Sequence, residues 1–295
     1  MEVSALSNFI ILTDSSCDLP ASMAAEMQIE VLPLTVYVDN DTYCNYLDGR
    51  EIGFHDFYER TKTAKNLKTS AVNQLQFIDV MEPLVAAGND VLYLGFSSGL
   101  SGTYNASVIA ATELREKYPD RKIITVDTLC ASLGQGLIVY HCWKQKQAGK
   151  TIEEVAAYAE EIKLHLDHWF TVNDLFFLKR GGRVSATTAI VGSALAIKPV
   201  MHVDDEGHLI KVSTARGRKA SIRALVDKME ELGENPGDQH VFISHGDCEE
   251  DANYLAKLVR ERFGTKDFTI NYVGPVIGAH SGPGTLALFY PANQR

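Results

Sequence analysis

A short apolar segment in the first half of the chain leads into a loop rich in serine and glycine, and an amphipathic segment follows that loop. Residues 91–96 are apolar, which predicts a buried strand, whereas apolar residues recur at helical spacing from Ala106 to Leu114. The loop, residues 97–103, therefore lies between the carboxyl end of a strand and the amino end of a helix. Free backbone N–H groups and the positive end of the helix dipole favour an anion at that position.

The same order of strand, polar loop and helix recurs before and after this segment. Residues 9–13, 31–38 and 122–126 predict further strands, with helical patterns between and after them. Strands that alternate with helices form a parallel sheet covered by helices, and ligands of such sheets bind beyond the carboxyl ends of the strands. Four loops are expected to meet there: residues 13–16, 69–70, 97–103 and 127–128.

The pattern changes after residue 168. Residues 200–203 and 209–214 flank a polar turn, which predicts an antiparallel hairpin, and further helices and strands follow. The predicted fold class is therefore α/β with two domains. Residues 1–168 are expected to form an N-terminal domain with a mostly parallel sheet flanked by helices, which carries the ligand-binding loops. Residues 169–295 are expected to form a C-terminal α/β domain with a mixed or antiparallel sheet.

The net charge and the cysteines argue against several classes of function. The 295 residues carry a formal net charge of -10, which argues against general nucleic-acid binding and against adhesion to an anionic membrane. The five cysteines form no Cys-x-x-Cys pair and are odd in number, so neither a disulfide framework nor a structural zinc site is predicted. The N-terminus has no basic start and no long apolar stretch, so we expect no signal peptide, no integral membrane association and a cytoplasmic location.

The four loops contain hydroxyls and carboxylates but no lysine or arginine. A polyphosphate site would more often include a cation, so the loops favour a single carboxylate group as their ligand. Asp14 and Asp127 could bind a metal ion or act as an acid and a base, but helix capping and hydrogen bonding within the loops are the favoured roles. No metal site and no cofactor are predicted.

Residues 95–99 also match the Gly-x-Ser-x-Gly nucleophile elbow, which lies between a strand and a helix in one class of hydrolases. The alternative function is therefore a serine esterase or thioesterase with Ser97 as the nucleophile and His280 as the base. Asp238 or Asp247 would be the acid of that enzyme. The strand comes early for such a fold and no HGGG-like loop precedes it, so a ligand-binding loop is favoured.

Two other segments carry candidate functional residues. Residues 179–185 hold three cations and two glycines, so they indicate either an anion or partner contact or a solvated basic turn. Residues 273–285 are predicted to form a glycine- and proline-rich loop, and its single histidine, His280, is a candidate for a hydrogen bond to a ligand carboxylate. A basic group around Arg216 favours a solvated surface when taken alone.

Five segments together resemble the DegV family in order and spacing, and they span essentially the whole chain: residues 13–15, 97–103, 127–136, 179–183 and 278–284. The resemblance implies a bacterial fatty-acid-binding protein of the FakB type, which is a carrier and not an enzyme. Such a protein holds a long-chain fatty acid in a buried tunnel, here expected in the C-terminal domain. It presents the carboxylate to the catalytic subunit of a fatty acid kinase for phosphorylation and use in phospholipid synthesis.

The resemblance also assigns roles to residues at matching positions. The residues expected to bind the carboxylate are Thr69, Ser98 and His280, with Ser97 and Ser70 beside them. The residues expected near the kinase are Arg180, Arg183 and Arg216. Where the family often has Thr-Ser-Gln-Pro-Ser, this chain has Thr-Ser-Ala-Val-Asn at residues 69–73. Residues 187–196 predict a helix that either lines the tunnel or belongs to the ordinary core.

Overall fold

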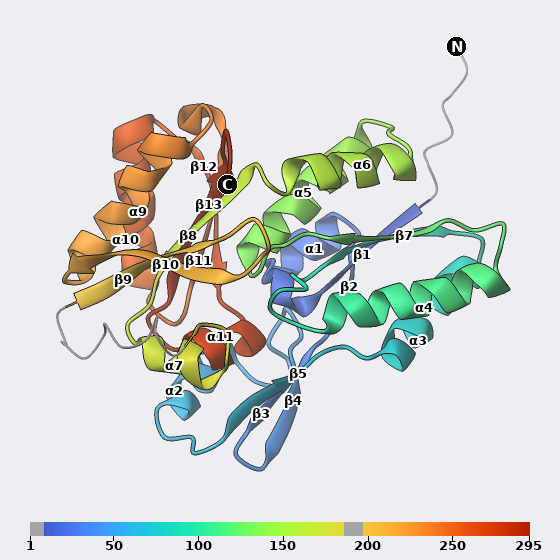
Figure 1. Ribbon diagram of the computed structural model, residues 1–295, viewed down its shortest axis with the longest axis horizontal. Coiled ribbons are helices and arrows are strands. Elements are labelled where there is room, and N and C mark those ends of the chain that lie inside the picture. Colours follow the sequence, from blue (N-terminus) through green and yellow to red (C-terminus); the bar gives the residue numbers. More distant parts are fainter. Residues whose placement is uncertain (1–8, 186–196) are drawn as a thin grey trace.

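The computed structural model describes residues 9–185 and 197–295. These residues form a four-stranded, a six-stranded and a three-stranded β-sheet. Figure 1 shows the four-stranded sheet, in blue and green, towards one end of the molecule and the six-stranded sheet, mostly yellow to red, towards the other. The predicted α/β class is confirmed, because the first of these sheets is parallel and flanked by helices and the second is mixed.

The parallel sheet has the strand order β2-β1-β6-β7. Its strands are β1 (Phe9–Asp14), β2 (Glu30–Leu32), β6 (Asp90–Gly95) and β7 (Ile123–Asp127). A 3-10 turn (Ser15–Cys17) and α1 (Ala21–Glu26) connect β1 to β2. Helices α3 (Gln74–Ala86) and α4 (Thr103–Lys117) cover one face, and α5 (Leu133–Gln147) and α6 (Ile152–Ile162) cover the other. Side chains alternate along β6, so Leu92 joins the core beneath α5 whereas Tyr93 joins the core beneath α3.

The strand predicted over residues 31–38 is two strands in two different sheets. β2 ends at Leu32, whereas β3 (Thr35–Val38) pairs with β4 (Asp41–Cys44) and β5 (Leu67–Ser70) in the three-stranded antiparallel sheet. Pro33 lies between the two strands and has no N–H group to continue a ladder, which explains the break. Thr69 therefore lies on strand β5 and not in a loop of the parallel sheet.

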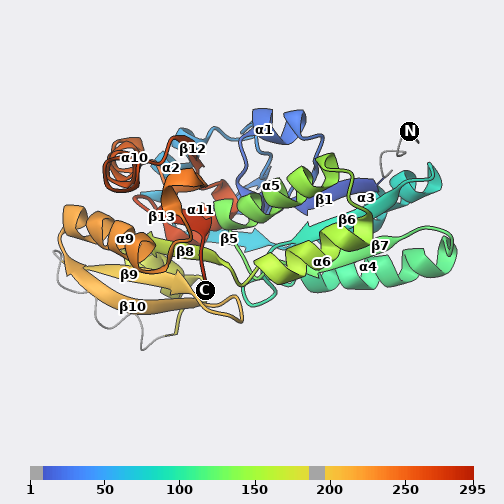
Figure 2. The same ribbon diagram turned by 90° about the horizontal axis from the view of Figure 1, so that it is seen from above.

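The mixed sheet has the strand order β10-β9-β8-β13-β11-β12. Its strands are β8 (Leu166–Thr171), β9 (Ile197–Val203), β10 (Leu209–Arg216), β11 (His240–His245), β12 (Asp267–Tyr272) and β13 (Leu286–Pro291). Helices α9 (Arg218–Leu232) and α10 (Glu249–Phe263) pack on one face of this sheet. On its other face, α5 contacts β11 and β13 while it also contacts β1 and β6, and Figure 2 shows it between the two larger sheets. Residues 166–168, expected in the N-terminal domain, belong to this sheet.

The glycine- and proline-rich segment before the last strand is a helix and not a loop. In α11 (Pro275–Ser281), proline occupies the first turn and Gly282 follows the last turn with a positive φ of 79°. Proline is pre-organised for a first turn, and glycine adopts positive φ after a last turn without steric cost. α11 packs against α2 (Phe54–Thr61), α7 (Leu175–Arg180) and β5, which brings His280 to the three-stranded sheet. The helix predicted over residues 187–196 lies outside the described residues.

Candidate ligand-binding site

A cavity of about 160 Å³ lies where β5, the loop after β6, the start of α5, α11 and the inner face of the mixed sheet meet. One water needs only roughly 15 Å³ by comparison, so the cavity has room for a ligand. Most of its wall is apolar and includes Leu100, Phe170, Leu178, Val276, Ile277 and Phe289. A cavity with such a wall and a few converging polar groups suits a ligand that is apolar over most of its length.

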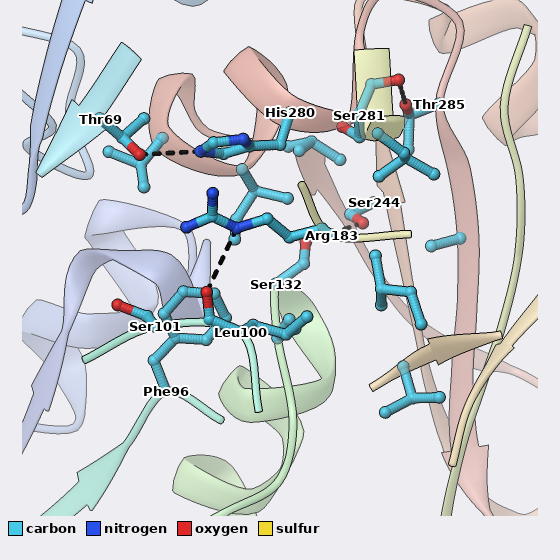
Figure 3. Close-up of a pocket in the computed structure, with 18 of the residues that line it drawn as sticks. Thr69, Phe96, Leu100, Ser101, Ser132, Arg183, Ser244, His280, Ser281 and Thr285 are labelled. Carbon is cyan, nitrogen blue, oxygen red and sulfur yellow. Dashed lines mark hydrogen bonds between the residues drawn. The ribbon is translucent and has the colours of Figure 1, made fainter. Parts of the chain in front are cut away.

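Two of the predicted residues meet at one end of this cavity. Thr69 Oγ1 on β5 lies 2.8 Å from His280 Nε2 on α11, although the residues are 211 positions apart in the chain (Figure 3). Burial, reinforced by Arg183 and Arg180, lowers the pKa of His280 to about 4, so the imidazole is neutral at pH 7. Its Nδ1 atom is buried and has no hydrogen-bond partner among the described residues. A Cβ atom at Gly181 would overlap this nitrogen, which explains the glycine after α7.

Arg183 places a positive charge at the same end. Its Nε donates a hydrogen bond to the Leu100 carbonyl at 3.2 Å, and its Nη1 donates to the Gly181 carbonyl. Figure 3 shows the guanidinium between His280 and Leu100. Burial lowers the pKa of Arg183, but a guanidinium stays protonated in proteins. The described residues give it no carboxylate partner, so the charge is available to an anionic ligand.

The four predicted ligand-binding loops contain no lysine or arginine, but the cavity wall contains Arg183. Arg183 comes from the segment after α7, which no local pattern places near β5. The sequence predicted a partner or anion contact for Arg183, and the structure places its side chain in the wall of the cavity.

Two hydroxyls complete the polar end. Ser70 lines the cavity beside Thr69, and its Oγ lies 3.1 Å from the Tyr37 hydroxyl. Ser101 also lines the cavity, and its Oγ lies 2.9 Å from Thr103 Oγ1. Ser101 was missed as a site residue although it belongs to the hydroxyl-rich loop that the sequence analysis singled out.

The structure does not bring Ser97 and Ser98 into the cavity wall. Ser97 Oγ is buried and donates to the Gly207 carbonyl at 2.9 Å, in the turn between β9 and β10. Ser98 is exposed, and its backbone N–H donates to Asp127. The N–H groups of Leu100 and Ser101 both bond to the Ser97 carbonyl, so the chain turns back at this point. This turn places residues 100–102, and not Ser97 and Ser98, against the cavity.

The catalytic triad of the esterase alternative is not assembled. Ser97 Oγ bonds to Gly207, whereas His280 bonds to Thr69. Asp247 accepts a hydrogen bond from His55 Nδ1 at 3.0 Å, and Asp238 lies in a 3-10 turn (Pro236–Asp238). The residues proposed for the triad therefore do not hydrogen-bond to one another.

The carboxylates of Asp14, which is buried, and Asp127, which is half-buried, organise loops at the sheet edge, which is the role that the sequence favoured. Asp14 accepts the Tyr93 hydroxyl at 2.6 Å and the Phe96 N–H at 3.1 Å, so it anchors the start of the loop after β6. Burial raises its pKa despite these hydrogen bonds. Asp127 accepts the N–H groups of Ser98 and Leu129.

Residues 69–73, where this chain differs from the usual family sequence, end in a helix cap. Asn73 accepts the Gln76 N–H at 3.0 Å, while the Gln76 side chain accepts the Asn73 N–H at 2.9 Å, which forms a capping box at the start of α3. A capping box satisfies two backbone donors that would otherwise be unpaired. Val72 is buried beside it. The cap therefore fixes the chain just after Thr69 and Ser70 without the family's proline.

The other two predicted arginines lie on the surface. Arg180, at the end of α7, is exposed and its guanidinium lies 4.8 Å from the centre of the Phe177 ring. Arg216, at the end of β10, is also exposed. Neither lines the cavity or forms an ion pair within the described part of the chain.

One surface group in the described ranges has side chains close enough to share a metal ion: His55, Glu59 and Asp247. His55 Nδ1 is already bonded to both Asp247 oxygens, at 3.0 Å each. The group is explained as a surface ion pair that joins α2 to the turn after β11.

The fold and the cavity define an α/β protein with three sheets and a largely apolar cavity that has a polar end. The sequence model of the DegV family matches residues 8–293, so the chain belongs to that family. A DegV domain-containing protein of Clostridium perfringens is 46% identical over 285 residues, which cover 97% of this chain and 98% of that protein.

Solved structures of the family share the whole fold. A DegV lipid-binding protein from Thermotoga maritima has a TM-score of 0.85 and 31% identity, covering 98% of this chain and 99% of that one. A second protein of the same organism, described as revealing a fatty acid binding function, has a TM-score of 0.83 and 30% identity, with 97% and 99% coverage. DegV of Bacillus subtilis, a fatty acid binding protein, has a TM-score of 0.83 and 26% identity, with 97% and 100% coverage. Within residues 9–185 and 197–295, no helix has the length and apolar character needed to cross a membrane.

Proposed function

We propose that this protein binds one long-chain fatty acid in the cavity, with the carboxylate at the Thr69 and His280 end, and presents that carboxylate to an acyl kinase. The observation that carries the proposal is a cavity whose wall is apolar apart from converging polar groups, with a cation, a hydroxyl and a neutral imidazole at one end. DegV relatives of about 30% identity that bind lipid or fatty acid support it.

The two parts of the cavity would contribute differently to binding. Each buried CH₂ group of the chain contributes about 0.8 kcal/mol, so the apolar wall supplies most of the affinity. A hydrogen bond to a charged group contributes about 1.5–3 kcal/mol, and only a few such bonds are possible at the polar end. The tail therefore sets how tightly the acid binds, and the polar end sets its orientation.

The neutral state of His280 leaves a proton donor for the carboxylate. If Nε2–H donates to Thr69 Oγ1, the threonine hydroxyl proton is free to donate to a carboxylate oxygen. In the other tautomer, Thr69 donates to Nε2 and the buried Nδ1–H is left unpaired. The first arrangement binds a carboxylate better, because the ligand then receives a hydroxyl donor beside the Arg183 guanidinium.

Presentation to a kinase requires that the carboxylate lie near the surface. Ala71 and Gly102 line the polar end and are exposed, whereas Phe289 and Leu178 in the apolar wall are buried. The exposed cations Arg180 and Arg216 suit contact with an acidic partner surface. The kinase would supply the nucleotide site, and the acyl phosphate formed there would be used in phospholipid synthesis.

Lipid extraction and native mass spectrometry of the purified full chain test the binding step. We expect about one equivalent of fatty acid, or stoichiometric uptake of stearic acid after delipidation. A delipidated protein that ignores added fatty acid would contradict the proposal. The kinase step is tested with Arg216→Glu, which should slow phosphorylation by a DegV-associated acyl kinase without weakening lipid binding. Lys257→Glu on α10 is the matched surface control, and equal loss in both variants would rule out a specific contact at Arg216.

A further inference from the structure

The cavity wall beyond the polar end is not uniformly apolar. On the inner face of the mixed sheet, Ser244, Ala287 and Phe170 lie side by side on β11, β13 and β8. The next row along the strands contains Phe289 and His168, about 7 Å further in, because side chains two residues apart share a face. Ser244 and His168 both line the cavity, so each row contributes a polar side chain to it.

Two of the lining polar side chains have no hydrogen-bond partner among the described residues. Ser281, at the end of α11, is 5% exposed, and its Oγ is buried and unpaired. The Thr285 hydroxyl bonds to the Ser281 carbonyl and not to this Oγ. His168 is 1% exposed, and both of its ring nitrogens are unpaired. Burial holds the pKa of His168 well below its usual range, opposed only weakly by the Leu166 backbone, so its ring is neutral and has one donor and one acceptor nitrogen.

A third polar group, Ser132, also lines the cavity. Ser132 Oγ donates to Asp18 at 2.5 Å and lies 3.0 Å from Ser244 Oγ. Ser132 occupies the N-cap position of α5 but makes no capping bond, and its backbone has φ 54° and ψ -146°. Such a conformation is sparsely populated for a residue with a side chain and persists only where the surroundings enforce it. The strained backbone directs the hydroxyl to Asp18 and Ser244, at the cavity wall, instead of to the helix.

Seen from Thr69 in Figure 3, Ser132, Ser244 and Ser281 lie beyond the Arg183 guanidinium. These groups would therefore face the chain of a bound acid and not its carboxylate. A hydrocarbon chain offers no hydrogen bond to the unpaired groups of Ser281 and His168, and a buried polar group without a partner costs free energy. An oxygen on the chain would remove that cost.

We infer that the cavity accepts a long-chain fatty acid that carries a hydroxyl or oxo group on its chain, with that oxygen bonded to Ser281 or to His168. This inference rests on the proposed function, because it assigns the part of the cavity that holds the acyl chain. The neutral imidazole and the serine hydroxyl can each donate to an oxo group or exchange donor and acceptor roles with a hydroxyl. The position of the oxygen along the chain decides which of the two residues it meets.

Displacement of a fluorescent fatty acid from the delipidated full chain tests the inference. Stearic acid is compared with hydroxystearic acids that carry the hydroxyl at successive positions along the chain. We expect at least one isomer to bind more tightly than stearic acid. Ser281→Ala or His168→Leu should reduce the affinity for that isomer about fivefold, as expected for the loss of one neutral hydrogen bond. The affinity for stearic acid should not fall in the same variant, because a hydrocarbon chain makes no hydrogen bond to either residue.

Thr171→Val is the matched control. Thr171 Oγ1 is also buried and unpaired, but it lies on the other face of β8 and does not line the cavity. This variant should keep the preference for the hydroxylated isomer. If every hydroxystearic acid binds more weakly than stearic acid, or if the preference persists in both Ser281→Ala and His168→Leu, the inference is overturned. Failure of stearic acid itself to bind would instead reject the proposed function.

Discussion

The loop after β6 and the pair formed by Thr69 and His280 are both rich in hydrogen-bonding groups, but they use them in opposite ways. In the loop, Ser97 Oγ bonds to the Gly207 carbonyl, and the N–H of Ser98 bonds to Asp127. These bonds are internal to the fold, and the bond to Gly207 holds the turn between β9 and β10 against the loop after β6. Thr69 and His280 bond to each other, but Nδ1 of His280 has no hydrogen-bond partner among the described residues.

This difference shows why a segment rich in polar residues is not necessarily a ligand-binding site. A segment dense in serine and glycine tends to satisfy its own hydrogen bonds, because partners lie close along the chain. A ligand site needs groups whose bonding capacity the fold leaves open. Here those groups come one at a time from β5, α11 and the segment after α7.

The largest effect on ligand affinity is expected at Arg183, at the polar end of the cavity. Arg183→Gln should lower the affinity for stearate about tenfold to a hundredfold, because it removes the only cation in the described wall of the cavity. Methyl stearate, which has no charge, should bind the variant and the original protein about equally. Isothermal titration of both ligands measures the difference. Arg180→Gln is the control for a nearby exposed cation, and equal losses for stearate and its ester would show that Arg183 acts through packing.

The next effect is on stability and comes from the loop. Ser97→Ala removes the buried donor to the Gly207 carbonyl and leaves that acceptor unpaired, which should lower the free energy of unfolding by about 1–3 kcal/mol. Denaturant unfolding measures the loss, and stearate affinity should stay unchanged. Ser98→Ala is the matched control, because its exposed side chain should contribute to neither property. A loss of fatty acid affinity in Ser97→Ala without a loss of stability would return Ser97 to the binding site.

A smaller effect is expected at Thr69. Thr69→Val keeps the shape of the side chain but removes the hydroxyl between His280 and the ligand, so phosphorylation of the bound acid should slow about fivefold. Tail binding, measured with methyl stearate, should change little. The matching change at Ser70, Ser70→Ala, tests whether the neighbouring hydroxyl on β5 shares the role. An unchanged phosphorylation rate in Thr69→Val would remove Thr69 from the carboxylate site.

Much of the fold could be predicted from the sequence because its signals are local. Apolar strands that alternate with amphipathic helices predicted the parallel sheet, and the turn at residues 204–207 predicted the hairpin of β9 and β10. Two predictions were wrong where proline and glycine were interpreted too simply. Pro33 splits one expected strand between two sheets, and the segment that begins at Pro275 is helix α11. In α11, the proline and glycines mark the ends of a helix and not a loop.

The site could be predicted only in part, because its residues are not neighbours in the sequence. The composition of residues 273–285 made His280 a candidate, and the family resemblance added Thr69. The structure brings the two together, while their binding of a carboxylate stays a prediction. Ser98 and not Ser101 was predicted as a carboxylate-binding residue. The chain turns between these two residues, so Ser101 lines the cavity and Ser98 does not. No local pattern indicates that the Arg183 side chain enters the cavity or that the hydroxyl of Ser281 is left without a partner.

The smallest effect is on the pH dependence of stability, which should change with His280 but not with Ser97. The folded-state pKa of His280, about 4, lies below the value near 6.5 of an unfolded histidine, so the unfolded state binds the proton more readily. The stability that depends on the neutral ring is therefore complete above about pH 6.5 and is lost as the pH falls towards 4. Between pH 7 and 6, His280→Gln should lose less stability than the original protein, by under about 1 kcal/mol. The Ser97→Ala variant should instead show the same pH dependence as the original protein, because Ser97 does not titrate. Identical slopes in His280→Gln and the original protein would mean that the His280 ring is solvated, and that the polar end is more open to water than its contacts with Gly181 and Thr69 imply.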